Sequence, residues 1–214
     1  MGMPTKHAAG IGTLLTVVVT CTAFLSGQAQ RLEPLDSTGR ITYFIGEGAA
    51  GSAYRPSDRE LAAWALKAWE RSAGGAVRLE PSPEQDALIR VRWVNAESGL
   101  YGEMRPINVN GRRGAEVFIR PDTDGLGGEI ARLARADTLM RETIVYLTCV
   151  HELGHAFGLD HTAEFNDIMY FFGFGGDIPG FFTRYRTQLK GRDDIANMSG
   201  VSPGDVERLR ALYR

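Results

Sequence analysis

Three of the four histidines in this chain lie between His151 and His161, and their spacing constrains the fold more than any other feature. The segment reads HELGHAFGLDH. On a helix, residues four apart lie on one face, so His151 and His155 can present imidazoles to one ion, with Glu152 directed at the same space. Glycine leaves a helix through a left-handed conformation without a Cβ penalty. Gly158 can therefore turn the chain sharply and bring His161 back to the same ion.

Three imidazoles around one ion leave a fourth position open for water, which is the coordination of a catalytic zinc rather than a structural one. We therefore expect a single zinc ion held by His151, His155 and His161. A carboxylate beside such an ion is suited to general-base catalysis. Glu152 is expected to take a proton from the water acidified by the metal and to return it to a leaving amine.

Met169 follows His161 at a distance of eight residues, within the sequence Asp167-Ile168-Met169-Tyr170. With this methionine, the segment resembles the metzincin metallopeptidases, whose motif is H-E-x-x-H-x-x-G-x-x-H followed by a methionine turn. The distance to Met169 is typical of the matrixin branch, and the resemblance covers about residues 40–214. It implies a mixed α/β (α+β) domain with a twisted, mostly parallel five-stranded sheet and an antiparallel edge strand. An active-site helix, the methionine turn and a C-terminal helix complete it.

The strand pattern agrees with this order. Runs rich in β-branched and aromatic residues predict five strands. They span residues 41–45, 77–80, 87–93, 100–105 and 116–120. The fourth is expected to stop at Pro106.

Capping residues predict the helices. Ser57 and Glu60 have the pattern of a capping box at the start of a first helix. Asp137 is a cap for a long helix that carries the histidines, and Ser202 with Pro203 opens the last helix. The segment 171–182, rich in glycine and phenylalanine, is not expected to form a regular element.

The resemblance also implies where a substrate binds. In matrixins the strand above the cleft pairs with an extended peptide, and here that strand carries Leu100, Tyr101 and Gly102. The residue four before the first zinc-binding histidine lies at the floor of the pocket for the side chain that follows the cut bond. That residue is Leu147. Tyr170 and the phenylalanines after it are candidate walls of the pocket.

The composition bounds the partners and other ligands. A formal net charge of -2 gives no reason to expect nucleic acid or an anionic membrane, so the expected partner is a protein or peptide substrate of a monomer. Matrixins often carry calcium, and Asp122 and Asp124 lie in an acidic turn. Two aspartates fall short of the six or more oxygens that calcium needs, so an ordinary turn is preferred there to a calcium site.

Residues 1–29 have the pattern of a secretory signal peptide, with Lys6 before an apolar stretch and small residues at its end. We expect a secreted or extracytoplasmic protein, with a connector at residues 30–40, a catalytic domain at residues 41–214 and no membrane span after cleavage. A retained anchor is less favoured because glycines and threonines interrupt the apolar stretch. A lipid on Cys21 is less favoured because threonine is unusual directly before such a cysteine. If the signal peptide is cleaved, Cys21 is lost with it. Cys149 would then have no cysteine partner and is expected to be a buried thiol.

The sequence thus predicts a zinc-dependent endopeptidase. A non-catalytic zinc-containing module that binds peptides along the same edge strand is the alternative, and Glu152 argues against it because binding alone does not need that carboxylate. A zinc hydrolase that acts on a non-peptide amide is a third interpretation.

Overall fold

The computed structural model of the chain describes residues 33–98 and 101–214. The predicted signal peptide and Leu100 lie outside these ranges. Within them, no helix has both the length and the hydropathy that a membrane crossing requires.

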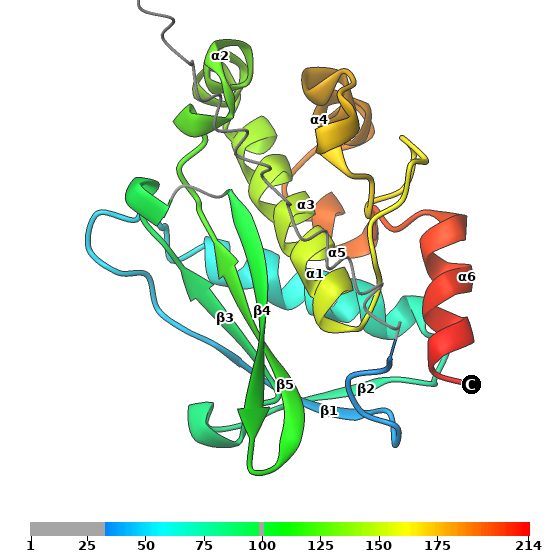
Figure 1. The fold of residues 1–214 in the computed structure, drawn as a ribbon. Helices are drawn as coiled ribbons and strands as arrows, with labels where there is room; N and C mark the ends of the chain where they lie inside the picture. Colours follow the sequence, from blue (N-terminus) through cyan, green and yellow to red (C-terminus); the bar gives the residue numbers. More distant parts are fainter. Residues whose placement is uncertain (1–32, 99–100) are drawn as a thin grey trace, which may run out of the picture. The chain divides into compact units, whose positions relative to one another are not determined.

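The described strands form one sheet with the order β2-β1-β3-β5-β4 (Figure 1). They are β1 (Arg40–Ile45), β2 (Arg78–Pro81), β3 (Ile89–Trp93), β4 (Gly102–Val109) and β5 (Arg112–Ile119). β1 pairs in parallel with β2 and β3, and β3 with β5. β4 is antiparallel to β5 and forms an edge. The predicted sheet, mostly parallel with an antiparallel edge strand, is confirmed.

One face of the sheet is apolar and the other is polar, because side chains alternate along each strand. Val91 in β3 and Val117 in β5 are register partners, and both are buried. On the opposite face, Arg92 and Glu116 form an ion pair at 3.0 Å. The helices α1 (Asp58–Ser72) and α3 (Thr138–Ala156) pack on the apolar face and against each other (Figure 1).

The remaining helices are α2, α4, α5 and α6. They span Gly128–Ala136, Ile178–Arg186, Asp194–Asn197 and Pro203–Leu212, with short 3-10 turns at Glu84–Asp86, Ala96–Ser98, Asp124–Leu126 and Phe172–Phe174. Two of the predicted caps are confirmed. The carboxylate of Asp137 accepts from Leu139 N at the start of α3, and Ser202 and Asp205 form a reciprocal capping box at the start of α6.

The fourth strand does not stop at Pro106, as the sequence suggested. β4 begins at Gly102 and continues through Pro106, which lies opposite Ala115. Proline cannot donate to a ladder, but an edge strand tolerates it where its nitrogen faces away from the sheet. Asn110 and Gly111, with φ of 53° and 82°, then form the two-residue turn into β5.

The segment 171–182 was expected to be irregular. This prediction is wrong for the second half of the segment. Helix α4 begins there at Ile178. Asp177 caps it by accepting from Gly180 N at 2.8 Å, and Pro179 lies in its first turn, where a missing N–H costs nothing. Phe181 and Phe182 are buried on one side of the helix. Gly180, Phe181 and Phe182, which belong to the run of glycines and phenylalanines that suggested a loop, are therefore part of a helix.

The predicted capping box at Ser57 is also absent, because the side chain of Ser57 makes no capping hydrogen bond. The carboxylate of the next residue, Asp58, accepts from Arg55 N at 2.8 Å instead. Asp58 also forms an ion pair with Arg141 of α3, and both side chains are almost fully buried. Arg141 donates further to Ala53 O at 3.2 Å. This pair joins α1, α3 and the loop before α1.

We expect Asp58→Ala to lower the free energy of unfolding by about 3–5 kcal/mol, because it leaves a buried guanidinium without its partner. Urea denaturation measures this change. Asp124→Ala is the matched control, since its ion pair with Arg135 is exposed and its loss should change stability little. A similar small change for both variants would show that the buried pair does not support the fold.

Candidate metal centre and its cleft

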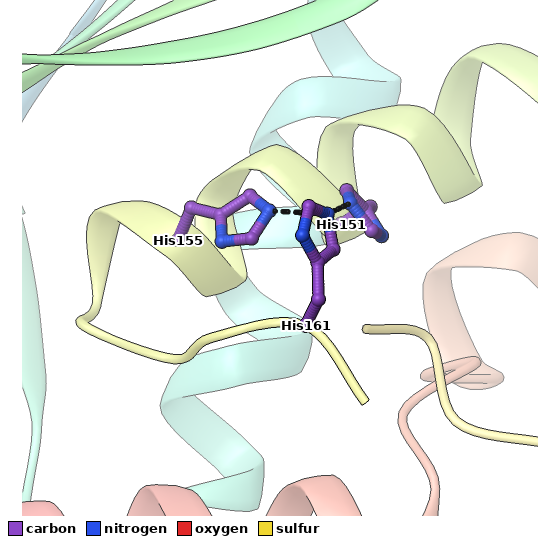
Figure 2. A group of neighbouring side chains, drawn as sticks. All are labelled: His151, His155 and His161. Carbon is purple, nitrogen blue, oxygen red and sulfur yellow. Dashed lines mark hydrogen bonds between the residues drawn. The ribbon is translucent and has the colours of Figure 1, made fainter. Parts of the chain in front are cut away.

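The three histidines of the motif converge on one point (Figure 2). Nε2 of His161 lies 3.3 Å from Nε2 of His151 and 3.2 Å from Nε2 of His155. Two of these side chains come from the last turns of α3, and the third comes from the segment that follows the helix. Among the described residues, this is the group of three or more His, Cys, Asp or Glu side chains that could hold a metal ion.

The other ring nitrogens show which tautomer is present. Nδ1 of His151 lies 2.6 Å from Ile168 O, and Nδ1 of His155 lies 2.8 Å from Leu159 O. A carbonyl oxygen can only accept, so Nδ1 carries the proton in both rings and donates it. The Nε2 lone pairs are left facing one another, an arrangement that a cation between them would stabilise.

The distances also fit zinc. Nitrogen ligands about 2.0–2.1 Å from a tetrahedral ion are about 3.3–3.4 Å apart, close to the separations found here. Burial, with a smaller contribution from the neighbouring His155, lowers the pKa of His151 to about 3. Burial, followed by His155, likewise lowers the pKa of His161 to about 4. The imidazoles are therefore neutral at neutral pH, which is the form that binds a metal.

Gly158 makes the turn that the sequence predicted. Its φ is 103°, and the chain reverses so that Leu159 N donates to Gly154 O at 3.0 Å. A Cβ on Gly158 would also lie 2.2 Å from Glu33 O, in the segment before β1. Two independent reasons, conformation and space, thus require glycine at this position.

The methionine turn lies directly beside the third histidine. Thr162 N donates to Met169 O at 2.8 Å, and Phe171 N donates to Thr162 O at 3.0 Å. These bonds tie the residue after His161 to both sides of the turn. The turn also supplies Ile168 O to His151, so one short segment positions two of the three histidines.

The network that holds this turn was missed from the sequence. Oδ2 of Asp205, on α6, accepts from Ile168 N at 2.8 Å and from Ser202 N at 3.2 Å. Ser202 Oγ in turn donates to Asp167 Oδ1 at 2.5 Å. The pattern Ser-Pro-Gly-Asp predicted a helix cap, but nothing in it showed that the capping carboxylate also binds the methionine turn.

Gly154 is a second residue whose role the sequence did not reveal. A Cβ on Gly154 would lie 2.3 Å from Met169 Sδ and 3.0 Å from Trp69 Cζ2. Met169 is fully buried, and Trp69 donates from Nε1 to Val150 O at 2.8 Å. The helix can therefore lie this close to α1 and to the methionine turn only because position 154 has no side chain.

Glu152 is directed into the same space as the histidines and is 8% exposed. Burial, with a smaller contribution from the nearby Glu103 carboxylate, raises the pKa of Glu152 to about 8. A divalent cation beside it would favour the ionised form. A Cβ on Gly102 would lie 2.5 Å from Glu152 Oε1, so the missing side chain at the start of β4 provides the space that this carboxylate occupies.

A cavity of about 530 Å³ adjoins the histidines. The candidate substrate-binding residues Tyr101, Gly102, Leu147 and Tyr170 all line it. Four phenylalanines form much of its remaining wall, namely Phe171, Phe172, Phe181 and Phe182. The cavity is thus largely apolar beyond the histidines, Glu103 and Glu152.

Other candidate residues lie away from this centre. Asp122 pairs with Arg120 at 2.6 Å, and Asp124 pairs with Arg135 at 2.5 Å, so both carboxylates of the acidic turn already have cationic partners. Cys149 is buried, and burial raises the pKa of its thiol, as expected for an unreactive cysteine.

The sheet, the helix with its histidines and the turn beneath them together define the class of zinc metallopeptidases. The sequence model of the matrixin family matches residues 35–174, and the chain belongs to this family. Matrixins act on proteins and are typically secreted or extracellular. A search of curated proteins finds no match to the chain.

We expect Gly154→Ala to destabilise the protein by about 1–3 kcal/mol, because the added methyl overpacks the space held by Met169 and Trp69. Alanine is the better helix former by about 1 kcal/mol, so propensity alone predicts the opposite sign. Gly128→Ala is the control, since that helical glycine has open space around its Cβ position. Chemical denaturation of both variants decides. Equal or increased stability of Gly154→Ala would contradict the close packing.

Proposed function

We propose that the chain is an exported zinc endopeptidase whose metal is held by His151, His155 and His161. The observation that carries the proposal is the convergence of three imidazole Nε2 atoms beside a buried carboxylate, at one wall of an open cleft. Two of the imidazoles are fixed by backbone carbonyls, so the ligands are preorganised. The signal-peptide pattern of residues 1–29 supports export.

In this proposal each group has one task. Bound zinc supplies a Lewis acid that lowers the pKa of a water and polarises the peptide carbonyl. Glu152 takes a proton from the attacking water and delivers it to the leaving amine. Gly102 leaves room for that carboxylate next to the edge strand, where the substrate main chain would pair. The apolar cavity beside Leu147 receives the side chain that follows the cut bond.

Two alternatives predict different behaviour. A non-catalytic module would bind peptides along β4 but would not need a carboxylate buried beside the histidines. A hydrolase for small non-peptide amides would not need an edge strand that continues for several residues beyond the site. The free edge and the buried Glu152 together therefore favour peptide hydrolysis.

We expect Glu152→Ala to retain zinc and to lose hydrolysis of a protein substrate by a factor of about 10²–10⁴, the usual contribution of a general base. His161→Ala is the comparison, because removing a ligand should lower zinc content and activity together. Atomic absorption and a casein digestion, with and without chelator, measure the two properties. Loss of zinc from Glu152→Ala, or survival of its activity, would contradict the assigned roles.

We expect cleavage before Leu, Ile, Met or Phe and little before Asp, Glu or Lys. Leu147 lies one helical turn before His151, is buried and lines the cavity without offering a charge. Each buried methylene contributes about 0.8 kcal/mol, so leucine over alanine after the cut should gain about 2 kcal/mol, or about thirtyfold in kcat/KM. Profiling on a peptide library tests this. A preference for charged residues after the cut would show that Leu147 does not form the pocket.

A further inference from the structure

The hydrogen-bonding pattern of β4 determines which of its backbone groups face the open edge of the sheet. Arg120 N donates to Tyr101 O at 3.0 Å, and these residues continue the register in which Gly102 lies opposite Ile119. Directly opposed residues that bond in this way form the hydrogen-bonded type of antiparallel pair, and that type recurs at every second residue. Positions 101, 103, 105, 107 and 109 therefore direct their N–H and C=O groups toward β5.

The turn at the other end of β4 independently indicates which residues direct their backbone groups toward β5. Asn110 and Gly111 both have positive φ, as in a type I′ hairpin turn, and the pair that closes such a turn is Val109 with Arg112. This pair is of the hydrogen-bonded type, which agrees with the odd-numbered positions. The groups at Gly102, Met104 and Pro106 consequently face outward, away from β5.

The outward positions can be placed relative to the cut bond. Gly102 lies against Glu152, and residues 101–104 line the cavity beside the histidines together with Leu147. In the proposed peptidase, an added strand antiparallel to β4 places the substrate residues before the cut along the strand from Gly102 toward Pro106. With Gly102 opposite the residue just before the cut, antiparallel pairing places Met104 opposite the third residue and Pro106 opposite the fifth.

We propose that Pro106 ends the part of the edge strand that binds substrate, so that main-chain recognition extends to the third residue before the cut and not to the fifth. This inference rests on the proposed peptidase function. Met104 offers both an N–H and a C=O to an added strand. Pro106 has no N–H, and its ring carbon Cδ occupies the place from which an N–H would donate. Pro106 is also exposed, so no described segment covers this part of the edge.

Pro106 can be replaced without disturbing the sheet, because the backbone groups of β4 alternate between facing β5 and facing outward. Its nitrogen faces away from β5, so Pro106→Ala adds an outward N–H without changing the ladder between β4 and β5. The variant is expected to gain a function, and a gain cannot be produced by misfolding.

The test uses peptides of one sequence that are acetylated at the N-terminus and begin one, two, three, four or five residues before the cut. Alanine is used at the fourth and fifth positions so that the added residues contribute few side-chain contacts and report mainly main-chain hydrogen bonds. The acetyl C=O occupies the place of the carbonyl of the preceding residue. The peptide that begins four residues before the cut is therefore the first to offer a carbonyl at the fifth position. We measure kcat/KM for each length, and the affinity of each peptide for Glu152→Ala by fluorescence anisotropy.

For the unmodified enzyme, kcat/KM should rise up to the peptide that begins at the third residue and stay level on extension to the fourth. In Pro106→Ala, this extension should raise kcat/KM by about two- to tenfold, as for one added hydrogen bond. Met104→Pro should lose the gain between the peptides that begin one and two residues before the cut, because the acetyl group of the longer peptide first supplies the carbonyl of the third position. Met104→Ala, which keeps the N–H, should retain this gain.

A rise for the unmodified enzyme equal to that of Pro106→Ala, or no rise in either, would overturn the inference. Equal behaviour of Met104→Pro and Met104→Ala would overturn it as well. Failure of the peptidase function is a separate result. In that case no peptide is cut, while the affinities of Glu152→Ala and Glu152→Ala/Pro106→Ala still show whether the length dependence exists.

Discussion

Three imidazole Nε2 atoms directed at one point constrain the rest of this structure, because nitrogens about 3 Å apart need a shared cation or a rigid frame around them. The frame is visible in backbone groups. Ile168 O and Leu159 O fix two of the rings, and the bonds of Thr162 to the methionine turn fix the segment that follows the third. α6 then fixes the turn through Asp205, so the C-terminal helix supports a centre that it does not touch.

Glycine provides space around this centre as much as conformational freedom. Gly154 lets α3 approach Met169 and Trp69, and Gly102 leaves room for the Glu152 carboxylate beside the edge strand. Neither of these two has a positive φ, so the reason for glycine lies in what its Cβ would meet. Helix α3 is consequently packed closely on both sides, which holds its histidines in place.

The sequence predicted what depends on local spacing. Some features depend only on residues that are close in the sequence, and they appear as expected. They are the helical spacing of His151 and His155, the turn at Gly158 and the caps at Asp137 and Ser202. What it could not predict are the partners brought together by folding. The pairing of Asp58 with Arg141 replaced an expected capping box, and Asp205 gained a second role at the methionine turn. The predicted strand was ended at Pro106 because proline is tolerated only in an edge strand. Whether a strand lies at the edge depends on how the whole sheet assembles.

X-ray absorption at the zinc edge on the purified, zinc-loaded protein tests the metal-ligand assignment directly, because it reports the ligand atoms themselves. We expect one zinc per chain with three imidazole nitrogens at about 2.0–2.1 Å and one oxygen. In His161→Ala the imidazole contribution should fall to two. A sulfur ligand, or a spectrum that His161→Ala leaves unchanged, would contradict the assignment of His151, His155 and His161 as the metal ligands.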